Sequence, residues 1–191
     1  DVYKRQGRVF GFAYGHKENG AMFSHMAMMY ANALYKRGMV DEGWKVIDTI
    51  YNFSRDFSKS HMYPGIPEYF SQRGRGMYPY LTGSASWLLL TLLTEAYGVK
   101  GKLGDLLLEP KLMPGQFSIE GHACVYTLFA GKKFKICYRN PRLLPYERYA
   151  VRQIILNGST ILKDGREKSI CISADRISSL PDEVELDVLL D

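Results

Sequence analysis

The chain has 191 residues, of which 46% are hydrophobic and 24% are charged, so it carries enough apolar side chains for one or two packed cores. This composition excludes a mainly disordered protein. No apolar run reaches the roughly 20 residues that a membrane-spanning helix needs, which excludes a transmembrane protein. The net charge of +5 comes from scattered basic residues, without the concentrated stripe that nucleic-acid binding needs. We therefore expect neither a membrane nor a nucleic acid as a partner.

The three cysteines, Cys124, Cys137 and Cys171, are widely spaced. This spacing predicts neither a disulfide framework nor a zinc site. We therefore expect free thiols in the core, no bound metal, and a reducing, cytoplasmic setting.

The segment Asp1–Gln6 matches the translation of a transposon end that is used to prepare sequencing libraries. We expect it to be foreign to the protein, and we exclude it from the interpretation of the fold. We also expect the natural chain to continue upstream, whether the segment is foreign or the protein is cut at Asp1.

Two amphipathic helices are predicted first. Apolar residues recur three and four apart from Ala21 to Arg37, and Gly38 ends this pattern. Asp41 is expected to cap a second helix, and the short connection makes the pair an αα-hairpin.

Residues 57–80 interrupt the helical pattern with prolines, glycines and four tyrosines. They predict a long ordered loop, and such loops often carry function. A third helix is expected from about Gly83 to Tyr97. Because it is apolar on all sides, we expect it to be buried.

The hydrophobic period changes to two after Gly101, which predicts short strands separated by turns. The expected strands are 106–108, 117–119, 123–129, 134–138, 149–156, 169–172 and 184–190. Asn157-Gly158 suits a hairpin turn. The sequence therefore predicts an α+β protein with helices over 7–100 and an antiparallel β-sandwich over 101–191.

The stretch Thr82–Trp87 places a hydroxyl, a glycine and small residues at the start of an apolar helix. Free amide groups and the positive end of the helix dipole make such a helix start suitable for binding an anion. The alternative is structural: Thr82 caps the helix, and the small residues allow close packing.

Lys17 and Glu18 lie together in an expected loop and could donate to and accept from sugar hydroxyls. His25 could contact an anion if it faces the same cavity. The alternative for His25 is a helix histidine whose ring nitrogens are satisfied by neighbouring groups.

The loop Tyr63–Phe70 combines aromatic rings with a carboxylate. Tyr69 offers a flat face for a sugar ring, and Glu68 can accept its hydroxyls. The alternative is that the aromatic loop serves packing alone.

These stretches occur in one order: Gly15–Gly20 with His25, Ile66–Phe70, Leu81–Trp87, and then Leu108–Pro110. Together they resemble the carboxy-terminal part of glycoside hydrolase family 94, the cellobiose-phosphorylase-like glycoside phosphorylases, over about residues 8–160. The most specific feature is the Leu-Thr-Gly-Ser-Ala-Ser-Trp string at its distance from Lys-Glu-Asn-Gly. The resemblance implies that 7–100 are the last helices of an (α/α)6 catalytic barrel and that 101–191 form a small β-sandwich domain.

The resemblance also implies an inverting phosphorolysis, in which inorganic phosphate as co-substrate cleaves a β-glucosidic di- or oligosaccharide to a sugar 1-phosphate. His25, Thr82 and Gly83 match phosphate-binding residues of the family, and Lys17 and Glu18 match residues of the acceptor sugar subsite. Glu68 and Tyr69 are candidate sugar contacts. No other cofactor and no metal is implied, and family members are often dimers, so a homodimer is an option for the full-length protein.

The family's general acid is an aspartate that would lie upstream of Arg8, and so would an arginine of the phosphate site. We therefore assign no catalytic residue within this chain. Fewer residues separate His25 from Thr82 than in the cellobiose-specific members, which leaves the identity of the disaccharide open. A hydrolase or transglycosylase on the same scaffold and a non-catalytic carbohydrate-binding module are the alternative functions.

Overall fold

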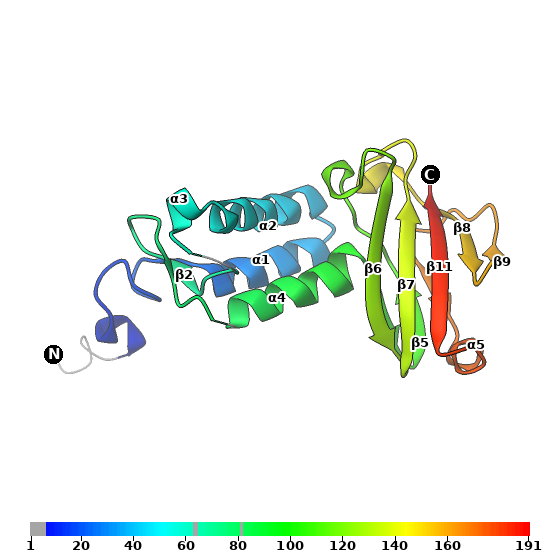
Figure 1. The fold of residues 1–191 in the computed structure, drawn as a ribbon, viewed down its shortest axis with the longest axis horizontal. Helices are drawn as coiled ribbons and strands as arrows, with labels where there is room; N and C mark the ends of the chain where they lie inside the picture. The colour runs from blue at the N-terminus through cyan, green and yellow to red at the C-terminus, as the bar shows by residue number, and fades with distance from the viewer. Residues whose placement is uncertain (1–6, 63–64, 81) are drawn as a thin grey trace. The chain divides into compact units, whose positions relative to one another are not determined.

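The computed structural model describes residues 7–62, 65–80 and 82–191, and Figure 1 shows its elements. The expected foreign segment Asp1–Gln6 lies outside the described residues, as do Tyr63 and Pro64 of the predicted loop and Leu81 of the family string. The chain is an α+β protein that divides into two compact units, Asp1–Thr91 and Leu92–Asp191. This division lies upstream of the boundary expected at Gly101.

The first unit contains the predicted αα-hairpin (Figure 1). Helices α1 (Ser24–Lys36) and α2 (Val40–Arg55) pack against each other, and α1 also packs against α4 (Gly83–Thr91). Gly43 allows the close approach of α1 and α2, because a Cβ atom there would lie 2.6 Å from the ring of Tyr35.

Helix α2 begins two residues earlier than the sequence predicts. Its N-cap is Met39, so the prediction that Asp41 caps the helix was wrong. Asp41 instead lies in the first turn, where its carboxylate forms an ion pair of 2.6 Å with Lys45 one turn later. A carboxylate in the first turn also interacts favourably with the helix dipole, which accounts for an acidic residue there without a cap.

The third predicted helix is α4, continued by a π-helical turn, η3 (Leu92–Ala96), that belongs to the second unit. The prediction that it is buried on all sides was wrong. Leu88 is buried, and the buried Thr91 accepts a hydrogen bond from Asn32 of α1, whereas the side chain of Leu89 is 64% exposed. In the described chain α1 covers only one side of α4, so the apolar residues on the other side remain in solvent.

The predicted loop over 57–80 begins with a short helix, α3 (Phe57–Ser60). A separate 3-10 turn, η2 (Arg8–Gly11), lies near the start of the described chain. Strands β1 (Met22–Phe23), β2 (Tyr69–Phe70) and β3 (Gly76–Met77) form one antiparallel sheet in that order. Because β1 leads directly into α1, this sheet fixes the loop beside the first turn of α1.

The second unit contains two sheets. One has the order β10-β5-β4 and the other the order β6-β7-β11-β8-β9, and all pairs are antiparallel except the parallel pair of β7 and β11. Their bounds are β4 (Val99–Lys102), β5 (Asp105–Leu108), β6 (His122–Phe129), β7 (Lys132–Arg139), β8 (Val151–Leu156), β9 (Ser159–Leu162), β10 (Ile170–Ile172) and β11 (Glu183–Leu190). Short helices η4 (Pro114–Gln116), η5 (Tyr146–Arg148) and α5 (Ala174–Ser178) connect them.

The predicted strands correspond to β5, β6, β7, β8, β10 and β11, whereas β4 and β9 were not expected. The strand predicted at 117–119 was wrong, because this stretch follows η4 without pairing and leaves the side chain of Ile119 99% exposed. The predicted turn is confirmed: Asn157 and Gly158 both have positive φ and join β8 to β9.

Alternate residues of the larger sheet are buried, as period-two patterning predicts. Phe134, Ile136 and Tyr138 of β7 are at most 2% exposed. The hydroxyl of Tyr138 donates to the main-chain oxygen of Tyr97 at 2.6 Å, and burial raises its pKa well above the usual value.

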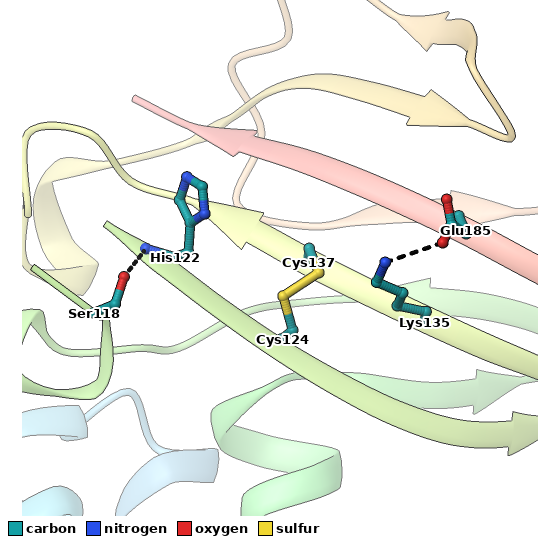
Figure 2. Close-up of a disulfide and its surroundings, with 6 residues drawn as sticks. All are labelled: Ser118, His122, Cys124, Lys135, Cys137 and Glu185. Carbon is teal, nitrogen blue, oxygen red and sulfur yellow. Dashed lines mark hydrogen bonds and ion pairs between the residues drawn. A yellow bond between two sulfur atoms is a disulfide. The ribbon is translucent and has the colours of Figure 1, made fainter. Parts of the chain in front are cut away.

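The prediction of free, buried cysteines was wrong. Figure 2 shows Cys124 of β6 and Cys137 of β7 joined by a disulfide, at positions that face each other in the antiparallel pair. Cys124 is exposed, Cys137 is half-buried, and Cys171 is exposed with a free thiol. Spacing along the sequence gave no sign of this pair, because strand register brings the two residues together. The expectation of a reducing, cytoplasmic setting depended on the expectation that the chain has no disulfide, and the structure contains one.

No helix in the described part of the chain combines the length and the apolar character needed to cross a bilayer.

Loss of the Cys124–Cys137 disulfide should destabilise the second unit. A loop closed by residues 13 apart predicts a decrease in the free energy of unfolding of about 3 kcal/mol for the double change Cys124→Ser and Cys137→Ser. Urea unfolding of the 191-residue chain measures it, with Cys171→Ser as the matched control. An unfolding midpoint that does not change on reduction with dithiothreitol would contradict this expectation.

The first unit should not fold alone. Met26 and Tyr30 on α1 and Leu89 on α4 are each about 60% exposed, and a large exposed apolar surface favours association. We expect residues 7–91 to aggregate or to unfold without a cooperative transition, as measured by calorimetry and sedimentation. A cooperative transition of a monomer would show that this unit needs no further partner.

Candidate functional site

The imidazole of His25 lies against Gly83 in the first unit. His25 is in the first turn of α1, and Gly83 is the first residue of α4. A Cβ atom at Gly83 would lie 2.5 Å from Cε1 of His25 and 2.7 Å from each ring nitrogen. Only glycine leaves room for the ring, so the structure brings together two residues that the family resemblance assigns to a phosphate site.

Thr82 acts in part as a helix cap. Its hydroxyl accepts a hydrogen bond from the amide of Ser84 at 3.3 Å, as the structural alternative predicts. Gly83 and Ala85 lie in the first turn of α4, where the amides have no acceptor within the helix and can donate to other groups. The hydroxyl of Thr82 also keeps its own proton as a donor. The start of α4 therefore still presents donors, together with the positive end of the helix dipole.

The main-chain oxygen of Glu68 joins the segments that form this site. It accepts from the amide of Ser24 at 2.9 Å and from the hydroxyl of Ser84 at 3.5 Å. Ser24 is the first residue of α1, and Ser84 is the second residue of α4. One carbonyl thus holds the two helix starts close to each other and to strand β2.

The hydroxyl of Ser24 is a buried polar group at this junction. Ser24 is fully buried, and its Oγ atom has no hydrogen-bond partner among the described residues. Such a group is costly unless water or a ligand satisfies it. Ser24 directly precedes His25 in the chain. Its hydroxyl is therefore a further polar group beside His25 that could bind water or a ligand.

Lys17 lies between a carboxylate and two aromatic rings. Its Nζ atom is 3.6 Å from Oε2 of Glu68, 4.4 Å from the ring centre of Tyr78 and 5.3 Å from that of Phe12. The side chains of Lys17 and Glu68 are about four-fifths buried, so their interaction is screened less than a surface pair. Glu18, next in the turn, is exposed.

Tyr69 packs inside the loop rather than presenting an open face. It is 1% exposed, and its hydroxyl lies 3.2 Å from Nδ1 of His16. Burial raises the pKa of the Tyr69 hydroxyl above its usual value. Its role as a sugar contact stays a prediction. The neighbouring ring of Tyr78, 5.8 Å away between centroids, is the more accessible one.

Sequence reasoning missed four residues of this site: Phe12, His16, Ser24 and Tyr78. The aromatic content of 57–80 pointed to Tyr78 only as one tyrosine among four. Nothing in the sequence pattern indicates that Phe12 reaches Lys17, since the contact depends on the local turn that returns Asn19 to the main-chain oxygen of Phe12.

The arrangement contains two neighbouring groups of side chains, one suited to an anion and one suited to a sugar. The α4 start with His25 can hold an anion, and Lys17 with Glu68 and Tyr78 offers a donor, an acceptor and an aromatic face. In the described ranges no three His, Cys, Asp or Glu side chains gather in a way that could hold a metal ion.

Comparison with known proteins assigns neither a family nor a function to the chain. No protein-family model matches the chain, and no curated protein is significantly similar to it. The interpretation of the site therefore depends on its own residues.

Replacing Gly83 with alanine should displace the imidazole of His25, because the added methyl occupies the position of the ring. Gly83 has no positive φ that would exclude alanine, and the half-buried ring of His25 has room to move, so the change should cost little stability. We expect a clear shift of the His25 Hε1 resonance in the NMR spectrum. Gly11→Ala is the control, because a Cβ atom there meets nothing within 4 Å. An unchanged His25 resonance in Gly83→Ala would contradict the contact.

Proposed function

We propose that this chain is the carboxy-terminal part of an inverting glycoside phosphorylase that cleaves a β-glucosidic di- or oligosaccharide with inorganic phosphate. The observation that carries the proposal is the His25 ring against Gly83, at a helix start whose first amides have no acceptor within the helix. The resemblance to glycoside hydrolase family 94 assigns phosphate to these residues, and their geometry supports that assignment.

In this proposal, the first unit supplies the charge compensation for phosphate. The amides of Gly83 and Ala85, the hydroxyl proton of Thr82 and the imidazole of His25 are the donors at the start of α4. Donors fixed in this way stabilise the dianion and hold one of its oxygens toward the anomeric carbon. Ser24 can add a further hydroxyl.

Inversion requires one protein carboxyl group, because phosphate arrives as an anion and needs no base. A phosphate oxygen forms the new bond to the anomeric carbon while the glycosidic bond breaks. The leaving oxygen takes its proton from a general acid, which this proposal places on a segment upstream of Gly7. The products are a sugar 1-phosphate and a shortened acceptor.

The acceptor sugar would be held by Lys17, Glu18 and Glu68. The ammonium of Lys17 donates to hydroxyls, the two carboxylates accept from them, and Tyr78 provides a flat apolar face. The Lys17–Glu68 pair keeps both side chains in place before the sugar arrives, which lowers the entropy cost of binding.

The finer architecture belongs to the same proposal. The helices of the first unit would be the last ones of an (α/α)6 barrel, and the second unit would be its β-sandwich domain. The exposed apolar side chains of α1 and α4 support this interpretation, since helices inside a closed ring are covered on both sides.

Removal of a phosphate donor should slow phosphorolysis strongly while the fold persists. In the full-length protein we expect His25→Ala and Thr82→Val each to lower the phosphate-dependent rate about 10²- to 10³-fold. The measurement is release of sugar 1-phosphate against phosphate concentration, with the exposed His122→Ala as the matched control.

Unchanged dependence on phosphate in both variants would overturn the proposal. Cleavage by the wild type without any phosphate would favour the hydrolase or transglycosylase. Sugar binding without cleavage under any condition would favour the non-catalytic module.

A further inference from the structure

A polar cavity of about 480 Å³ in the second unit serves no role in the proposed reaction. It is formed by the region around η5, the start of β8, the loop before β10 and the end of β11. Its charged lining consists of four cationic side chains, Arg148, Arg152, Arg166 and Lys168, and two acidic ones, Glu147 and Asp191.

Two of the cations are fixed by main-chain carbonyls. Nζ of Lys168 donates to the oxygens of Tyr146 and Tyr149 at 2.7 and 2.6 Å, and it lies over both aromatic rings. Arg152 donates to the main-chain oxygens of Asp191 and Gly165, both at 3.2 Å. These contacts set the positions of both cations. In the 191-residue chain the oxygen of Asp191 belongs to the terminal carboxylate, so it offsets part of the charge of Arg152. The ammonium of Lys168 is held by carbonyl oxygens and forms no ion pair with a carboxylate among the described residues.

The acidic side chains do not balance this charge. The carboxylate of Asp191 forms an ion pair with Arg142, outside the cavity lining. Glu147 is exposed and favours the charged form of Lys168, yet burial still lowers the pKa of that lysine below its usual value. Arg148 and Arg166 are exposed and form no ion pair within the described ranges.

We propose that this cavity binds a phosphate group, either as inorganic phosphate or as a phosphate monoester. Guanidinium groups match phosphate oxygens in paired hydrogen bonds, and the exposed Arg148 and Arg166 are available to make them. The fixed positive charge of Lys168, together with the two exposed guanidinium groups, favours a dianion over a monoanion such as chloride. The volume exceeds what phosphate alone needs and lies within the range of small-molecule sites.

The site shares no residue with the proposed phosphorolysis site, so either can fail without the other. We would titrate the isotope-labelled 191-residue chain with inorganic phosphate and, separately, with glucose 1-phosphate, and follow the backbone amides of 147–152 and 165–168 by NMR. We expect saturable shifts of these amides and, because a bound dianion stabilises its charged form, a rise in the pKa of Lys168.

The test variant is Arg148→Gln with Arg166→Gln, since both side chains are exposed and the fixed cations remain. We expect at least a tenfold loss of affinity. The control is Lys163→Gln with Arg176→Gln, which removes the same charge from exposed positions outside the cavity lining.

Tighter binding of glucose 1-phosphate than of inorganic phosphate supports a monoester as the ligand, and the reverse order supports free phosphate. The absence of saturable shifts with both probes would overturn the proposal, as would equal affinity in the test and control variants. Shifts confined to Gly83 and His25 would also overturn it while leaving the proposed function intact.

Discussion

The candidate site depends on one carbonyl group. The main-chain oxygen of Glu68 receives hydrogen bonds from Ser24 and Ser84, and so it joins the start of α1 to the start of α4. His25 follows Ser24 in the chain and Gly83 precedes Ser84, so these two hydrogen bonds also position His25 and Gly83. Since both serines are fully buried, water competes little for these bonds. The side chain of the same Glu68 forms an ion pair with Lys17, which connects the proposed phosphate-binding groups to the proposed sugar-binding groups.

The two interpretations of the α4 start are compatible. A capping threonine uses one acceptor lone pair for the amide of Ser84, and this leaves the hydroxyl proton and the other first-turn amides for an anion. Glycine at position 83 allows the His25 ring to pack there, because the ring fills the space that a Cβ atom would occupy. Close packing and anion binding both require a small residue at position 83. The sequence pattern alone therefore could not distinguish the structural interpretation from the binding interpretation.

Local features of the fold could be predicted from the sequence. The helical periodicity located α1 and α2, and Asn157-Gly158 located a hairpin turn. Features that depend on tertiary context could not be predicted: the exposure of Leu89 depends on which neighbours cover α4, and the disulfide depends on the register of β6 and β7. The same division holds for the site. The resemblance singled out His25 and Gly83, whereas Ser24 and Tyr78 become part of the site only through the fold around Glu68.

The central claim is that His25 and the start of α4 bind phosphate as one unit. It is tested most directly by recording the imidazole of His25 and the amide of Gly83 together in one NMR titration with inorganic phosphate. The account predicts that both signals move and saturate with a single dissociation constant. Movement of only one signal, or of neither at saturating phosphate, would contradict it.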